Sequence, residues 1–220
     1  MNQTKFRHFI SSSLPIWILF FGHLFATLFL KNLGHGLEAI EDSQLRSLAQ
    51  LLYLVYLQVS QWAVPMMLVL IVFLQIRVCF GKPGQLGIDI MGVLLSIRCI
   101  FLFVILNLLL LSKLKAGGML LLQLVLFIPV ITLNFGWLYW RLDTSARLKG
   151  RTHIKFSEAA GTLDPFDYFH VAAKTLLQFA PAGAEATSRL MKVLFVLHGI
   201  MMLDLVALTL SRAIALASGG

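Results

Sequence analysis

Residues 88–111 read IDIMGVLLSIRCIFLFVILNLLLL, a stretch that is apolar almost throughout. About 20 such residues, coiled as an α-helix, cross the hydrocarbon core of a bilayer. Similar runs cover residues 12–30, 48–76, 119–139 and 190–217. In lipid, only helices and closed barrels satisfy every backbone polar group, and these runs are too long for barrel strands. The sequence therefore predicts an all-α, multi-pass membrane protein with five transmembrane helices.

The composition agrees with a membrane protein. Of the 220 residues, 59% are hydrophobic and 13% are charged, whereas about a quarter of a soluble domain is charged. The formal net charge is +8. Because the basic residues lie at the ends of the apolar runs, we expect them to set orientation and meet lipid head groups, and we expect no nucleic-acid partner.

Catalytic and metal-binding patterns are not found in the sequence. Cys79 and Cys99 have neither metal-ligand nor disulfide-framework spacing. His23 and His198 fall at unmatched depths of two spans, which does not favour a haem site. No nucleophile triad or glycine-rich phosphate loop stands out. We therefore expect no enzyme activity, no cofactor and no metal.

The distribution of lysine and arginine predicts the orientation. With five spans, one side holds the N-terminus, the second connection and the fourth, and it carries nine basic residues; the other side carries five. The nine are Lys5, Arg7, Arg77, Lys82, Arg141, Arg147, Lys149, Arg151 and Lys155, and the five are Lys31, Arg46, Lys113, Lys115 and Arg212. Cytoplasmic loops are enriched in these residues, so the N-terminus is expected in the cytoplasm of a cell with this protein in its plasma or inner membrane.

Between the first two spans, Leu37, Ile40 and Leu48 recur at helical spacing among acidic and basic residues. This pattern predicts a short amphipathic helix that leads into the second span. Pro65 lies in the middle of that span and is expected to kink it.

Two ionisable residues fall near the centres of spans, Arg98 in the third and Asp204 in the fifth. Each would cost roughly 2.5–3.5 kcal/mol if it were alone in lipid. We expect the two to form a contact, within a subunit or between subunits. Such a pair would either fix helix packing or line an ion or proton path.

A short amphipathic helix is predicted over residues 165–180. Asp164 is a good N-cap, Pro165 suits the first turn, and Pro181 and Gly183 mark the end. A helix of this length is too short to span a bilayer, so it is either re-entrant or interfacial. We expect an apolar stripe of Phe166, Phe169, Ala173, Leu176, Leu177 and Ala180, and a polar stripe of Asp167, His170, Lys174 and Gln178.

Residues 119–217 resemble the pore module of two-helix ion channels of the potassium-channel class, and channel-like membrane proteins of bacteria. The order of a span, then DYFHVAAKTLLQFAPAG (167–183), then SRLMKVLFVLHGIMMLDLVALTLSRAI (188–214) follows the class order of outer helix, pore helix, filter and inner helix. The best register sets Thr175 on the first filter threonine. The resemblance implies a re-entrant helix and an oligomer, for which a tetramer is one candidate, with the fifth span lining the axis.

The filter itself departs from the class pattern. Gln178, Phe179 and Ala180 stand in place of Gly-Tyr-Gly, and those glycines allow the backbone shape whose carbonyls replace an ion's hydration shell. Potassium selectivity is therefore not carried over. The orientation differs as well, because pore loops of that class enter from outside, whereas the basic-residue count puts this one on the cytoplasmic side.

Two functions remain in view. One is a channel-like oligomer with Lys174, Thr175, Gln178 and Phe179 near its path. The other is a non-conducting subunit whose amphipathic helix and basic linker dock a cytoplasmic protein or anionic lipid; the linker residues are Arg141, Arg147, Lys149, Arg151 and Lys155. We divide the chain into an N-terminal three-helix region (1–115) and a pore-module-like region (116–220).

Overall fold

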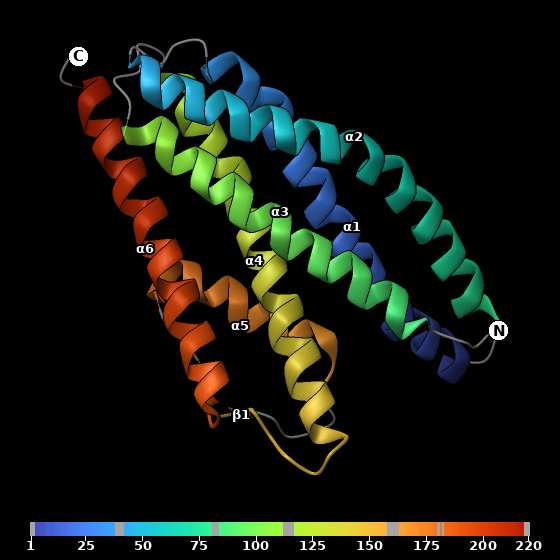
Figure 1. The fold of residues 1–220 in the computed structure, drawn as a ribbon. Coiled ribbons are helices and arrows are strands. Elements are labelled where there is room, and N and C mark those ends of the chain that lie inside the picture. The colour runs from blue at the N-terminus through green and yellow to red at the C-terminus, as the bar shows by residue number, and fades with distance from the viewer. Residues whose placement is uncertain are drawn as a thin grey trace.

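A computed structural model describes residues 3–37, 42–80, 84–111, 117–157, 163–179, 181 and 183–217. In these ranges the chain forms six helices and a two-stranded sheet (Figure 1). The order is α1 (Gln3–Leu37), α2 (Ser43–Cys79), α3 (Gln85–Leu111), α4 (Gly117–Arg147), β1 (Ile154–Phe156), α5 (Pro165–Gln178), β2 (Ala184–Ala186) and α6 (Arg189–Ala217). The all-α fold class is confirmed.

Five of these helices are long and apolar enough to cross a membrane. The segments are Ser13–Lys31, Ser43–Cys79, Gln85–Leu108, Val125–Arg147 and Arg189–Ser211. Each overlaps one of the five predicted runs. The number and order of candidate spans therefore agree with the sequence, and α5 is the short sixth helix.

The polar connection after the first span differs from the prediction. α1 continues to Leu37, and α2 begins at Ser43, where the Asp42 carboxylate accepts hydrogen bonds from two backbone N–H groups. Leu48 therefore belongs to α2 itself rather than to a separate amphipathic helix, while Ile40 lies outside the described residues. α2 includes Pro65 within its length.

The helices pack around α1 and α4. α1 contacts α2, α3 and α4, whereas α6 packs mainly on α4 and α5. In Figure 1 α5 lies between α4 and α6, partway along both. The two predicted regions of the chain thus meet where α1 packs along α4.

At the end of the molecule where α4 ends and α6 begins, β1 and β2 pair antiparallel, with Lys155 opposite Glu185. The sheet extends no further among the described residues. It ties the connection that follows α4 to the connection that precedes α6, and so fixes both ends of the segment that carries α5.

Candidate functional site

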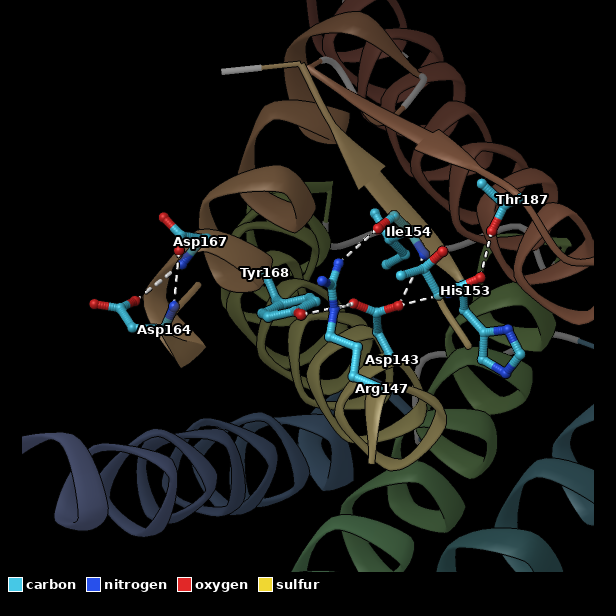
Figure 2. A network of polar contacts seen from close by, with 9 residues as sticks. Asp143, Arg147, His153, Ile154, Asp164, Asp167, Tyr168 and Thr187 are labelled. Carbon is cyan, nitrogen blue, oxygen red and sulfur yellow. Dashed lines mark hydrogen bonds and ion pairs between the residues drawn. The ribbon is translucent and has the colours of Figure 1, made fainter. Parts of the chain in front are cut away.

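The start of α5 is built as the sequence predicts. The Asp164 carboxylate accepts hydrogen bonds from the backbone N–H groups of Phe166 and Asp167, and the Asp167 carboxylate accepts one from the N–H of Asp164. This is a reciprocal capping box, with Pro165 at the first helical position. Figure 2 shows both carboxylates at the outer end of the helix.

A buried carboxylate anchors α5 to α4. Asp143 is fully buried, and it accepts hydrogen bonds from Tyr168 Oη (2.7 Å), Arg147 Nε (2.6 Å) and the backbone N–H groups of His153 (2.6 Å) and Ile154 (2.9 Å). Arg147 also donates to the Ile154 carbonyl. Figure 2 shows this convergence of α4, β1 and α5 on one side chain. Burial and the hydrogen bond to Asp143 raise the pKa of Tyr168 well above its usual value, so its hydroxyl keeps its proton.

Two glycines, Gly136 of α4 and Gly199 of α6, allow α5 to pack closely against both helices. A methyl group added at Gly136 of α4 would overlap the ring of Phe169, and one added at Gly199 of α6 would lie 2.5 Å from the carbonyl oxygen of Phe179. Gly136 lies eleven residues before the end of α4 (Gly117–Arg147), and Gly199 lies ten residues after the start of α6 (Arg189–Ala217). α5 therefore packs against the interior of two candidate spans rather than against their ends.

The buried face of α5 differs from the predicted apolar stripe. The buried residues of α5 are Pro165, Tyr168, Phe169, Val171, Ala172 and Thr175. Phe166 and Leu177, which belong to the predicted apolar stripe, are 60% and 81% exposed. Of the predicted apolar stripe, Ala180 lies outside the described residues, Phe169 is buried and Leu176 is half-buried. The helix therefore turns apolar side chains outward, which a water-facing helix would not favour.

The four predicted filter-like residues do not share one environment. Thr175 is fully buried, and its hydroxyl donates to the Val171 carbonyl of its own helix. Lys174 is half-buried, whereas Gln178 is exposed. Phe179 ends the helix in the left-handed conformation (φ 53°), which non-glycine residues seldom adopt. Only Gln178 and Phe179 are thus available at the surface near the end of α5.

Arg98 has other partners than the predicted Asp204. Its side chain is buried and donates to Tyr56 Oη (2.6 Å), His23 Nδ1 (3.0 Å), the His23 carbonyl (3.4 Å), Thr27 Oγ1 (2.9 Å) and Ser60 Oγ (3.4 Å). Guanidinium has five N–H donors, so these five acceptors match them in number. All five lie on α1 and α2, and no carboxylate contacts Arg98 within the described ranges.

The tautomer of His23 follows from its two contacts. Its Nε2 lies 3.0 Å from the carbonyl of Met91, which can only accept, so Nε2 carries the proton. Nδ1 is then the acceptor for Arg98, and the imidazole is neutral. The predicted contact between Arg98 and Asp204 is therefore replaced, within this chain, by a set of neutral acceptors around the Arg98 cation, and these contacts join α1, α2 and α3.

A second polar group lies between α4 and α6. His198 is fully buried, stacks on Phe135 (ring centroids 4.2 Å apart) and has its Nδ1 2.9 Å from Tyr139 Oη. Its Nε2, like one carboxylate oxygen of Asp204, finds no hydrogen-bond partner in the described part of the chain. Within that part no three histidine, cysteine or acidic side chains gather as metal ligands.

The five residues of the predicted basic linker separate into two groups. Arg141 forms a two-pronged ion pair with Asp89 of α3, and Arg147 pairs with Asp143. Lys149, Arg151 and Lys155 are exposed. The positive charges outside these two ion pairs therefore lie on the turn after α4 and on β1.

Sequence reasoning missed the acceptors of Arg98 and the role of Asp143. The spacing of Tyr56 and Ser60, four residues apart in one apolar run, was an available signal for a shared helix face. For Asp143 the spacing indicated only Arg147, four residues later on the same helix; its other partners, Tyr168, His153 and Ile154, lie beyond the end of α4. Comparisons with protein-family models, curated proteins and solved structures found no match for this chain.

Proposed function

We propose that this protein is a channel-like membrane subunit in which α5 is re-entrant and an ion path runs past its C-terminal end. The observation that carries the proposal is the position of α5, with Phe169 at Gly136 and the Phe179 carbonyl at Gly199. If the candidate spans cross a bilayer, both contacts fall inside it rather than at the ends of the helices. A helix that only lay on the surface would contact the ends of its neighbours instead.

The dipole of α5, with its carbonyl end at Phe179, would favour the passage of cations. The last carbonyl groups of a helix have no partner within it and carry a partial negative charge. Here that end lies beside the middle of α6. Carbonyl oxygens can replace part of an ion's hydration shell, so the end of α5 would lower the cost of a cation at that depth. Gln178 would add an amide oxygen.

The proposed path needs more than one copy of the chain. The outward face of α5, with Phe166 and Leu177, is not covered by the described helices of its own chain. A homo-oligomer with α5 and α6 around its axis would enclose the ends of the α5 helices. A tetramer is one such arrangement, as the resemblance to pore modules implies.

Ion flux through purified protein in liposomes tests this function. We expect cation flux that Gln178→Leu reduces severalfold, because that change removes the amide at the end of α5. Thr175→Val is the matched control: Thr175 is buried and bonded to its own helix, so flux should stay close to that of the unaltered protein. Absence of flux across ion types, pH and voltage would refute conduction.

A non-conducting docking function is the second candidate, and the exposed turn after α4 favours it. Gly150 has a left-handed φ of 70°, and the N–H of Arg151 donates to the Ala146 carbonyl, so the turn holds Lys149 and Arg151 outward. A Lys149→Gln, Arg151→Gln, Lys155→Gln variant should lose a cross-linked acidic partner and keep any ion flux. Recovery of the same partner from the variant would exclude docking through these residues.

A further inference from the structure

A small cavity opens between the beginning of α3 and the end of α4. Its volume is about 40 Å³, which is room for about three water molecules. The lining residues are Gln85, Ile88, Asp89, Trp140, Arg141, Thr144 and Leu148. One helical turn away from Asp89 and Arg141, the Trp137 ring of α4 fills the space over Gly92 of α3, since a methyl group at that glycine would overlap the indole. The two helices are therefore in close contact next to the cavity.

The cavity places an anion and a cation side by side. Asp89 and Arg141 pair through Nε and Nη2, and both side chains are 29% exposed. Arg141 keeps its Nη1 hydrogens for another acceptor, and each Asp89 oxygen keeps a lone pair for another donor. A ligand with a phosphate next to an ammonium would complement both groups at once.

Exposed apolar side chains also follow α3 on a neighbouring face of the helix. Leu86, Ile90, Val93, Ile97 and Ile100 recur at helical spacing and are all exposed. Trp140 lies at the cavity, and tryptophan is enriched at the level of lipid head groups. A ligand of this surface therefore has a zwitterionic head and long apolar chains, which describes a phospholipid.

We propose that this cavity binds the head group of a phospholipid with a primary ammonium, of the phosphatidylethanolamine class. The ammonium donates to Asp89, the phosphate accepts from Arg141 with Thr144 and Gln85 beside it, and the acyl chains follow α3. Phosphatidylcholine has a quaternary ammonium with no N–H, so it cannot donate to Asp89. Phosphatidylglycerol has no cation and meets the Asp89 carboxylate unfavourably.

Native mass spectrometry of the purified full-length protein, titrated with the three lipids carrying identical acyl chains, tests the proposal. We expect phosphatidylethanolamine to bind about tenfold or more tightly than phosphatidylcholine, as one charged hydrogen bond predicts. Asp89→Asn should abolish that preference and favour phosphatidylglycerol, because the phosphate then meets Arg141 without a competing carboxylate. Lys192→Gln, at an exposed residue of α6 outside the cavity, is the control and should keep the wild-type order.

Two further measurements, on a second variant and on a soluble ligand, test the phosphate contact and the role of the acyl chains. Thr144→Val keeps the ion pair and so the fold, and it should weaken all phosphate-bearing lipids alike without changing their order. Soluble phosphoethanolamine should bind far more weakly than the lipid, since it lacks the chains that follow α3. Equal affinity for phosphatidylethanolamine and phosphatidylcholine, or an unchanged preference in Asp89→Asn, would overturn the proposal.

Discussion

The carbonyl oxygen of Phe179 lies so close to the backbone of Gly199 that a methyl group on that glycine would come within 2.5 Å of it. The C-cap residue of α5 and Gly199 of α6 can therefore approach closely because position 199 has no side chain. Together with Phe169 on Gly136, this contact sets how deeply α5 lies between its neighbours.

Gly199→Ala is expected to displace the end of α5 and to cost roughly 1–3 kcal/mol, because the clash is with backbone. In a background without Cys79 and Cys99, Leu177→Cys should resist a water-soluble maleimide and become reactive when Gly199→Ala is added. Gly22→Ala is the control, since its added methyl meets only the flexible end of Leu95. Equal labelling with and without Gly199→Ala would argue against the seating of α5 on α6.

Tyr56→Phe is expected to destabilise the protein by roughly 1.5–3 kcal/mol, because it leaves the Nε–H of the Arg98 guanidinium without an acceptor. Thermal unfolding in detergent measures the loss. Tyr53→Phe, one turn earlier on α2, should change stability little, since no hydrogen bond of the Tyr53 hydroxyl is found among the described residues. A similar loss for both variants would show that the hydroxyl bond to Arg98 contributes nothing specific.

Asp143→Asn is expected to cost roughly 3 kcal/mol, because the new amide turns donors toward two of the four groups that now donate to the carboxylate. Chemical or thermal unfolding should show the loss together with faster proteolysis between α4 and α6. Asp167→Asn is the matched control: an asparagine oxygen can still accept from the N–H of Asp164, so the change should stay below about 1 kcal/mol. The assignment of Asp143 as the anchor would be wrong if both changes had the same effect.

The free energy of unfolding should fall at alkaline pH because the hydroxyl of Tyr168 ionises more easily in the unfolded chain. Its pKa is raised in the folded protein by burial and by Asp143, so the folded state holds this proton more tightly than the unfolded state does. The contribution is complete below the unfolded pKa of about 10 and declines as pH rises above it, by at most about 1.4 kcal/mol per pH unit. Melting temperatures from pH 8 to 11 should decline less steeply for Tyr168→Phe. Parallel curves for the two proteins would contradict this linkage.

Single cysteines test the expected orientation. With the native cysteines replaced, Lys149→Cys should react with an impermeant maleimide only after cells are opened, whereas Lys31→Cys should react in intact cells. The reason is the excess of basic residues on the side that holds position 149. The reverse pattern would put the N-terminus outside and would bring α5 in from the outer face.

The start of α5 could be predicted because a cap is local: Asp164, Pro165 and Asp167 determine it within one turn. Its buried face could not, since the usual rule turns apolar residues toward the protein. On α5 Phe166 and Leu177 face outward. In a lipid environment the outside is also apolar, so amphipathic spacing no longer identifies the inner face.

The sequence also did not predict which residues contact the charged side chains. The sequence indicated that the buried charge of Arg98 needed a partner, and the usual partner of a cation is a carboxylate. The structure instead supplies hydroxyls, one imidazole nitrogen and one carbonyl. Arg141 and Arg147 were expected to face lipid or a partner, and within the chain they pair with Asp89 and Asp143, which the sequence reasoning did not anticipate. Which acceptors surround a cation depends on helix rotation, which a single sequence does not give.

The neutral surroundings of Arg98 have an electrical consequence. Its partners satisfy the hydrogen bonds of the guanidinium without cancelling its charge, and no carboxylate contacts it in the described ranges. In a bilayer this fixed charge would repel a cation 4 Å away by about 4 kcal/mol at an effective dielectric constant of 20. Arg98 would thus oppose the entry of a cation among α1, α2 and α3, the helices that surround it.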